Sequence, residues 1–238
     1  MNSQNTMDIP FFHLNDIPSG GDAVFPEESS RHIVSVLRMR EGEPLRVVNG
    51  KGTMASARIA DAHKKHCRIE ILDIANIADS RKPMTLAVSL LKNPSRFEWM
   101  LEKVCEIGVH ALVPMICHRT ERGHVRMDRL HSIAMSAMLQ SRQAWLTEVK
   151  EPVTFDKLLA VAVQEDRFIA HCLPNGTEPL RSLHTSGATS LLLIGPEGDF
   201  TEKEISSALS SGFRAVGLGE NRLRTETAGV VAAALICV

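Results

Sequence analysis

Two short turns late in the chain carry the residue types best suited to binding a ligand. The first is the Gly-Pro-Glu-Gly sequence at 195–198, which directly follows the apolar run at 191–194. In open α/β sheets ligands bind where strands end, and glycine lets a ligand come close to the backbone. Thr201 and Glu204 have the spacing of a capping box, which predicts a helix after the turn. Taken alone, the turn fits two interpretations: a ligand-binding loop, or a tight strand–helix connection that needs glycine for its geometry.

The second turn lies at 217–227 and leads into the apolar run at 228–238. Two glycines end a short expected strand, and two arginines and a glutamate stand before the helix, which we expect Thr225 or Thr227 to cap. A purely structural helix start rarely concentrates such groups, so this turn favours a functional interpretation.

Several common chemistries lack their motifs in this sequence. The pair Gly217 and Gly219 has no third glycine, which makes it a poor dinucleotide fingerprint. There is no phosphate-binding G-x-x-x-x-G-K-[ST] loop, no G-x-S-x-G elbow and no H-E-x-x-H pair, and we expect no metal site. The five cysteines form no C-x-x-C pair, which predicts reduced thiols and a cytoplasmic protein.

The composition is that of a globular protein without a global charge. The 238 residues include 27 Lys+Arg and 28 Asp+Glu, a net charge of −1, which excludes a tail-driven nucleic-acid binder. With eight Phe, two Trp and no Tyr, an aromatic platform for stacked bases is not expected either. No apolar run approaches the roughly 18 residues of a membrane span, and the N-terminus has no signal-peptide pattern, so no membrane partner is predicted.

Basic residues nevertheless gather locally. Arginines outnumber acidic residues over 118–142, where three histidines are interleaved, and this segment is a candidate phosphate-contacting surface. A solvated helix face is the alternative interpretation of that charge run. A second, weaker cluster includes His32 and Arg38.

The first eighty residues are predicted to be rich in β structure. The Asn-Gly pair at 49–50 supplies the positive φ that a hairpin turn requires. One helix is expected over 27–39, with Ile33, Val36 and Leu37 on its buried face. Strands are expected at 45–48, 53–59 and 67–74, and a polar linker at 76–83.

Beyond Pro83 the pattern changes to alternating strands and helices. Ser95 and Glu98 predict a capping box at the start of the first helix. The alternation over some 150 residues predicts an α/β domain with a mainly parallel sheet. Strands are expected at 85–91, 111–116, 168–172 and 191–194, and further helices at 127–145, 155–163 and 228–238.

Together these motifs resemble the RsmE family of bacterial small-subunit (16S) ribosomal RNA (uracil-N3)-methyltransferases, members of the SPOUT superfamily. The match covers nearly the whole chain, and the two late turns at their observed separation are its most specific part. The other motifs are looser but occur in the right order: His32-x-x-x-Val36-Leu37-Arg38, Asn49-Gly50-x-Gly52, Lys103-x-x-Glu106-x-Gly108-Val109, Pro114 before Arg119, and Gln140-Ser141.

The resemblance implies two domains and a dimer. Residues 1–78 would form a PUA-like RNA-binding β-barrel, and 82–238 an α/β SPOUT methyltransferase domain that ends in a trefoil knot. In similar proteins a homodimer completes the RNA site, and the helix at 228–238 would be knot and dimer core.

The resemblance also assigns S-adenosylmethionine as cofactor and proposes roles for individual residues. Arg224 would be catalytic, with Arg119 as a second candidate, and Glu226 is expected to orient Arg224 or cap the helix rather than act as a base. Cofactor contacts are expected from Leu173, Ile194, Gly195, Glu197, Gly198, Leu218, Gly219, Leu223 and Thr225. Contacts to RNA are expected from His32, Arg38, Arg119 and Arg142.

The implied reaction is methylation of N3 of a specific uridine in the decoding region of 16S ribosomal RNA, within the small subunit and with no role for DNA. Two alternatives stay open. One is a related SPOUT enzyme that methylates another nucleotide, for example a ribose 2′-hydroxyl. The other is a non-catalytic assembly factor that binds ribosomal RNA and would not bind the cofactor.

The sequence departs from the family pattern in three places. Leu139 stands where a glutamate usually precedes the glutamine, and Asn221 and Arg222 stand where an arginine–aliphatic pair is common. Asp199 replaces a frequent glycine, and we expect it to help Thr201 cap the following helix.

Overall fold

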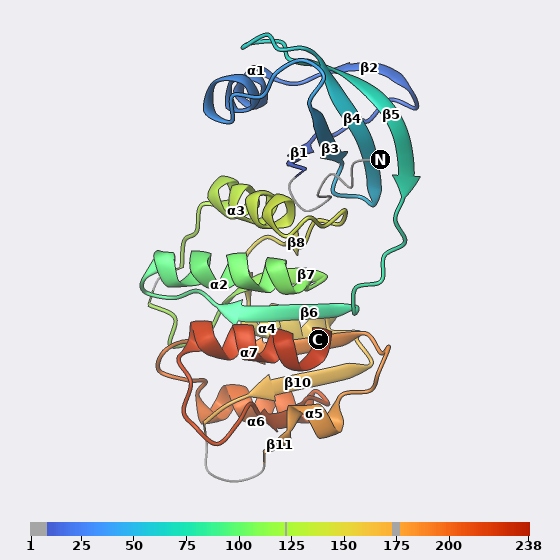
Figure 1. Ribbon diagram of the computed structural model, residues 1–238. Coiled ribbons are helices and arrows are strands. Elements are labelled where there is room, and N and C mark those ends of the chain that lie inside the picture. The colour runs from blue at the N-terminus through green and yellow to red at the C-terminus, as the bar shows by residue number, and fades with distance from the viewer. Residues whose placement is uncertain (1–8, 122, 173–176) are drawn as a thin grey trace. The chain divides into compact units, whose positions relative to one another are not determined.

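The computed structural model describes residues 9–121, 123–172 and 177–238, which form two compact units (Figure 1). The first unit contains the chain up to Asp79 together with Met138–Leu146. The second contains Ser80–Ala137 and Thr147–Val238. The contiguous division expected from the sequence puts 138–146 in the second domain, whereas the structure groups this segment with the first unit.

The first unit is built on a sheet whose order, in the part described, is β1-β3-β4-β5-β2. The pairs β3–β4 and β4–β5 are antiparallel, and Asn49 closes the turn between β3 and β4 by accepting hydrogen bonds from the Lys51 and Thr53 amides. Alternate side chains such as Val47 and Ile69 fill a core of their own. The strands are β1 (Phe11–His13), β2 (Gly21–Val24), β3 (Pro44–Val48), β4 (Thr53–Asp61) and β5 (Arg68–Asn76).

Backbone hydrogen bonds join 138–146 to that sheet's first hairpin. The Gly52 amide donates to Ala144 O at 3.0 Å, and the Leu146 amide donates to Gly50 O at 2.9 Å. Gly52 has φ +91°, and a Cβ there would lie 2.4 Å from the Trp145 ring. Only glycine tolerates both the positive φ and the close approach of the Trp145 ring. Segment 138–146 therefore packs directly against the hairpin turn.

The helix predicted over 27–39 is shorter and irregular. It consists of α1 (Glu27–Arg31) and a π-helical turn η1 (His32–Val36), and Arg38 follows with a left-handed φ of 58°. The π turn bonds five residues apart, so side chains spaced for an α-helix no longer share one face. Of the predicted apolar face Ile33 is buried, whereas Val36 is 64% and Leu37 45% exposed.

The second unit contains a parallel sheet in the order β11-β13-β10-β12-β6-β7-β8, with β9 also beside β7. Each of these pairs is parallel, which confirms the α/β prediction. The strands are β6 (Met84–Ser89), β7 (Ala111–Ile116), β8 (Glu148–Val149), β9 (Val153–Thr154), β10 (Asp166–Ala170), β11 (Glu178–Pro179), β12 (Ser190–Ile194) and β13 (Arg214–Gly217).

Helices cover both faces of this sheet (Figure 1). α4 (Phe155–Val161) and α6 (Glu202–Ser210) bury Phe155 and Ile205 against one face. On the other face α7 (Thr225–Cys237) packs on α2 (Pro94–Ile107) and on β6 and β12. α3 (Met127–Gln140) and α5 (Leu180–Leu183) complete the helices that concern the site, and no helix in the described ranges is long and apolar enough to cross a membrane.

The helix caps differ in part from those predicted. Thr201 and Glu204 form the expected capping box at α6. The predicted cap at Ser95 is wrong, because Asn93 caps α2 and accepts the Ser95 amide, with proline as the first helical residue. The predicted threonine cap of α7 is wrong too, since Arg224 occupies the cap position without a side-chain cap bond.

Candidate functional site

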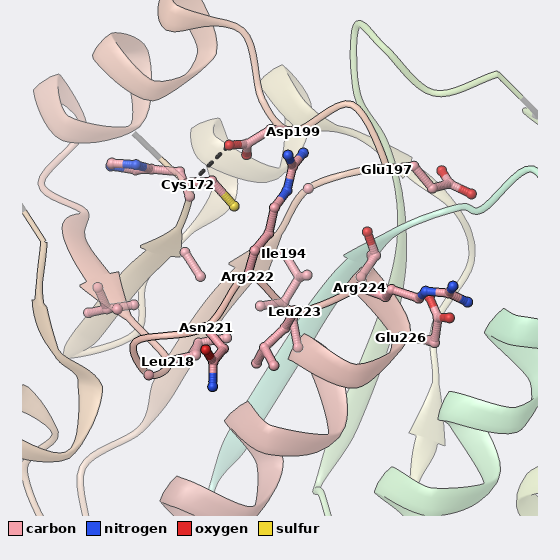
Figure 2. A pocket seen from close by; sticks show the side chains of 18 of the residues that line it. Cys172, Ile194, Glu197, Asp199, Leu218, Asn221, Arg222, Leu223, Arg224 and Glu226 are labelled. Atoms are coloured by element: carbon pink, nitrogen blue, oxygen red, sulfur yellow. Dashed lines mark hydrogen bonds between the residues drawn. The ribbon is translucent and has the colours of Figure 1, made fainter. Parts of the chain in front are cut away.

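A cavity of about 750 Å³ lies where three neighbouring strands end (Figure 2). β10 runs between β12 and β13, and because all three are parallel their carboxyl ends meet at one edge of the sheet. Both turns singled out in the sequence line this cavity. Its volume suits a small organic ligand.

The cavity collects most of the predicted cofactor residues. Gly198 does not line it, and a Cβ on Gly198 would lie 3.5 Å from Arg119 Cδ. Leu173 lies outside the described residues. The predicted residues that line the cavity are Ile194, Gly195, Glu197, Leu218, Gly219, Leu223, Arg224 and Thr225.

Aliphatic side chains and open backbone form one part of the wall. Ile194 and Leu223 lie close together near the centre of Figure 2, and Leu218 lines the cavity to the lower left of them. Gly219 has φ +143°, and no atom lies within 4 Å of the place a Cβ would take. An apolar surface beside accessible backbone donors and acceptors suits a flat heterocycle such as a nucleobase.

Gly195 is needed for packing inside the protein. A Cβ there would lie 3.0 Å from the Phe200 ring and 3.1 Å from the Phe200 amide nitrogen. The structural interpretation of the Gly-Pro-Glu-Gly turn therefore applies to Gly195 itself, although the turn also lines the cavity.

Asp199 connects two walls of the cavity. Its Oδ2 accepts the Cys172 amide at 2.8 Å and its Oδ1 accepts the Phe200 amide at 2.7 Å (Figure 2). The expectation that Asp199 helps to cap α6 is therefore wrong. Its φ of 63° explains why glycine suits this position and why aspartate, which tolerates the left-handed region, can replace it.

The titratable groups beyond β10 are held in their neutral forms. Burial lowers the pKa of His171, which favours a neutral imidazole near pH 7. Burial, with the charge of Asp199, raises the pKa of the Cys172 thiol. Cys172 is therefore a poor nucleophile, because the thiolate is the reactive form.

Arg224 and Glu226 have opposite surroundings at the start of α7. Arg224 is exposed at the cavity, and its guanidinium has no hydrogen bond or ion pair with any residue that the structure describes. Glu226 is only 7% exposed, and Arg96 Nε lies 3.7 Å from its Oε1. The expectation that Glu226 orients Arg224 or caps the helix is wrong, because the carboxylate pairs with Arg96 and α7 has no side-chain cap.

Sequence reasoning missed several residues of the wall. Arg96 comes from the first turn of α2, far from the late turns in sequence, and only the α2–α7 packing brings it to the cavity. Thr177 and Val216 also line the cavity. Thr177 lies directly before β11, and Val216 lies near the end of β13. Arg222 also lines the cavity, and it is one of the two arginines of the second turn, although no site role was predicted for it.

The predicted RNA contacts are divided between the two units. His32, Arg38 and Arg142 are exposed residues of the first unit, and the two arginines have left-handed φ values of 58° and 59°. Arg119 belongs to the second unit, where its Nη1 donates to Gly198 O at 2.7 Å and to Phe200 O at 3.3 Å. It thus holds the turn after β12.

Within the described ranges, no three His, Cys, Asp or Glu side chains gather in a way that could hold a metal ion.

The fold and the cavity define an α/β protein that binds a small ligand with a flat apolar part at the carboxyl edge of a parallel sheet, next to arginines. The chain belongs to the RNA methyltransferase family: residues 78–237 match the family described as RNA methyltransferase domain. Residues 25–72 match the RNA methyltransferase PUA domain. The resemblance inferred from the motifs is confirmed.

Relatives and solved structures agree with this assignment. The Ribosomal RNA small subunit methyltransferase E of Synechocystis sp. is 31% identical over 86% of this chain and 69% of the relative. The crystal structure of a probable rRNA-methyltransferase from Porphyromonas gingivalis has 37% identity and a TM-score of 0.89, covering 96% of this chain and 97% of that one. A Ribosomal RNA small subunit methyltransferase E from Neisseria gonorrhoeae, bound to S-adenosyl methionine, has 31% identity and a TM-score of 0.85 over 95% of each chain.

Proposed function

We propose that this protein transfers a methyl group from S-adenosylmethionine to N3 of a uridine in the decoding region of 16S ribosomal RNA. The observation that carries the proposal is the cavity at the ends of β10, β12 and β13, where Arg224 stands unpaired among the described residues beside an aliphatic wall. Similarity to relatives named for small-subunit ribosomal RNA supports the substrate class.

The residues present fit this cofactor. Ile194, Leu218 and Leu223 offer an apolar surface for the adenine, and the open backbone at Gly219 leaves room for the ribose. When bound, S-adenosylmethionine supplies a methyl group that its sulfonium already makes electrophilic.

The chain itself must position N3 and stabilise the charge that develops on the uracil. Holding N3 in line with the methyl group removes much of the entropic cost of the reaction. The free guanidinium of Arg224 would donate to O4 or O2 as negative charge grows there. The aliphatic wall would exclude water around that charge, which strengthens the interaction.

Recognition of RNA falls to other residues. N3 lies on the pairing edge, so the target base must leave its stack before it enters the cavity. His32, Arg38 and Arg142 would contact phosphates and set the register of the RNA. Arg119 is assigned to the turn after β12 instead, because its Nη1 already donates to two carbonyl groups there.

The finer features of the fold are part of the proposal. α7 contacts α5, which lies in the segment between β10 and β12, as expected if the chain end is tucked behind that segment in a SPOUT trefoil knot. We also propose that the PUA domain closes into a barrel, that the protein is cytoplasmic, where ribosomal subunits are assembled, and that it is a homodimer. Trp99 on α2 is 46% exposed, and α7 has no charged side chain after Glu226, which supports a partner on this face.

Cofactor binding separates an enzyme from an assembly factor. Isothermal calorimetry of the purified protein with S-adenosylmethionine should give saturable binding with one site per chain. Labelled methyl groups should then transfer to small ribosomal subunits that lack the modification and not to large subunits. A protein that binds small subunits without binding the cofactor would instead be the assembly factor.

A further inference from the structure

We propose that Glu226 accepts the N3–H of the target uracil through its Oε2 and takes that proton as N3 attacks the methyl group. The inference deepens the proposed function and rests on it. It starts from a polar group that the protein leaves unsatisfied in the wall of its own cavity.

Glu226 is nine-tenths buried, and its two oxygens differ. Oε1 faces Arg96 Nε at 3.7 Å, whereas Oε2 is fully buried and has no hydrogen-bond partner among the described residues. Leaving a buried acceptor unpaired is costly, and native proteins rarely do so without a ligand to complete the bond. Because Glu226 lines the cavity, the donor it lacks can come from a molecule bound there.

The other carboxylates of the wall are less suited to this role. Both oxygens of Asp199 accept backbone amides. Glu197 is exposed and accepts the Lys92 amide at 3.1 Å. Glu220 is exposed to solvent, where water satisfies it. Within the described part of the wall, Glu226 alone combines burial with a free acceptor atom.

Arg96 and Arg224 bring guanidinium donors to the cavity that Glu226 also lines. Arg96 holds Oε1 from α2, and Arg224 lies two residues before Glu226 at the cavity. The edge of uracil around N3 presents one donor, N3–H, between two acceptors, O2 and O4. The cavity wall offers a carboxylate acceptor without a partner and two guanidinium groups, the kinds of group that this edge requires, which favours uracil as the source of the missing donor.

The cavity that Glu226 lines holds several other charged or titratable groups, which bear on the pH dependence of the reaction. They are Arg96 from α2, Arg224 at the start of α7, Glu197 and Asp199 after β12, Glu220 and Arg222 after β13, and His171 and Cys172 after β10. Arg96 stabilises the negative charge of the carboxylate, as does the N-terminal turn of α7 in which Glu226 lies.

The proposed step balances as follows. The N3–H bond breaks and its proton forms an O–H bond with Glu226 Oε2. The electron pair left on N3 forms the bond to the methyl carbon, and the carbon–sulfur bond breaks with its pair returning to sulfur. The products are 3-methyluridine, S-adenosylhomocysteine and a protonated Glu226, which releases the proton to solvent when the products leave.

The test is the pH profile of single-turnover methyl transfer by the wild type and by Glu226→Gln, on undermethylated small subunits. The wild-type rate should be nearly flat from about pH 6.5 to 8.5, because Glu226 takes the N3 proton within the complex and no free uridinate is needed. The amide cannot take a proton, so the variant should be at least about 100-fold slower near neutral pH. Its rate should also rise about tenfold per pH unit, as free uridinate becomes available.

Two controls accompany the pH profile: the affinity of Glu226→Gln for the cofactor, and a glutamate-to-glutamine substitution outside the cavity. Calorimetry should give Glu226→Gln an affinity for S-adenosylmethionine close to that of the wild type, because the proposed donor belongs to the RNA. Glu202→Gln, in the exposed first turn of α6, should leave both the rate and its flat pH profile unchanged.

Either of two results would overturn the inference. One is a Glu226→Gln variant that is slow at every pH in parallel with the wild type, which indicates a structural role. The other is a large loss of cofactor affinity, which would assign the missing donor to S-adenosylmethionine. A wild-type protein that transfers no methyl group to uridine would overturn the proposed function itself.

Discussion

Arg224 and Glu226 are two residues apart, yet their surroundings assign them different tasks. Arg224 is exposed to the cavity with its guanidinium free of partners in the described structure, so it can follow charge that appears on a substrate. Glu226 is buried, held on one side by Arg96 and open on the other. A residue's position in the motif does not distinguish these roles, but its burial and partners do.

Replacing Arg224 by alanine should impair transfer more than binding. The side chain touches no other described residue through a polar contact, so its loss should leave the fold and the affinity for S-adenosylmethionine nearly unchanged. Loss of one donor to a developing negative charge typically costs about 100-fold or more in rate. Single-turnover transfer and calorimetry measure the two effects, and Arg181→Ala, at an exposed position of α5, is the control. Near-normal turnover would remove Arg224 from the chemistry.

Cys172 offers an independent probe of the cavity. Its thiol lines the wall, and burial raises its pKa, so less thiolate is present at pH 7.5 than in a free cysteine. Alkylation by iodoacetamide should therefore be slow at pH 7.5, accelerate as the pH is raised, and be suppressed by saturating S-adenosylmethionine. Mass spectrometry identifies the labelled site, with Cys172→Ser as control. Labelling that the cofactor does not slow would place the ligand elsewhere.

At the scale of the elements, α/β alternation was predictable because each strand and helix carries its own periodic pattern. The irregular elements, such as the π-helical turn and the cap of α2, could not be predicted in this way. The π-helical turn at His32–Val36 has an apolar spacing typical of an α-helix, and the choice of Asn93 over Ser95 as cap depends on the proline between them. The turns that line the site were found from their glycines, whereas Arg96 depends on packing between α2 and α7. That packing is tight, since a Cβ on Gly229 would lie 2.5 Å from Met100 Sδ.

Arg119 should act on cofactor binding through the turn after β12. Its two hydrogen bonds to Gly198 O and Phe200 O restrain the loop that forms one wall of the cavity. Arg119→Ala should weaken S-adenosylmethionine binding about tenfold, as expected for the loss of one to two hydrogen bonds, and Arg119→Lys should recover part of it. Arg126→Ala, which removes only an exposed pair with Asp128, is the matched control in calorimetry. Unchanged affinity in Arg119→Ala would return this residue to the RNA contacts.

At the scale of the whole molecule, the face of α7 that the chain leaves uncovered is where we expect the second subunit. Ala234 is an exposed residue in the apolar part of α7. Ala234→Glu would bury a charge in the proposed interface, which is strongly unfavourable, without disturbing the core of the monomer. Light scattering after size exclusion should show the variant as a monomer and the wild type as a dimer.

Leu209→Glu is the control for that experiment, because Leu209 is 46% exposed on α6 at the other face of the sheet. This variant should remain dimeric. A wild-type protein that is monomeric at micromolar concentration, or an Ala234→Glu variant that stays dimeric, would refute the proposed interface.

Identification of the methylated nucleoside tests the central claim most directly. The purified protein is incubated with labelled S-adenosylmethionine and undermethylated small ribosomal subunits, and the RNA is digested to nucleosides for mass analysis. We predict that the label is recovered in 3-methyluridine. Recovery in a 2′-O-methylated nucleoside, or no transfer at all, would contradict it.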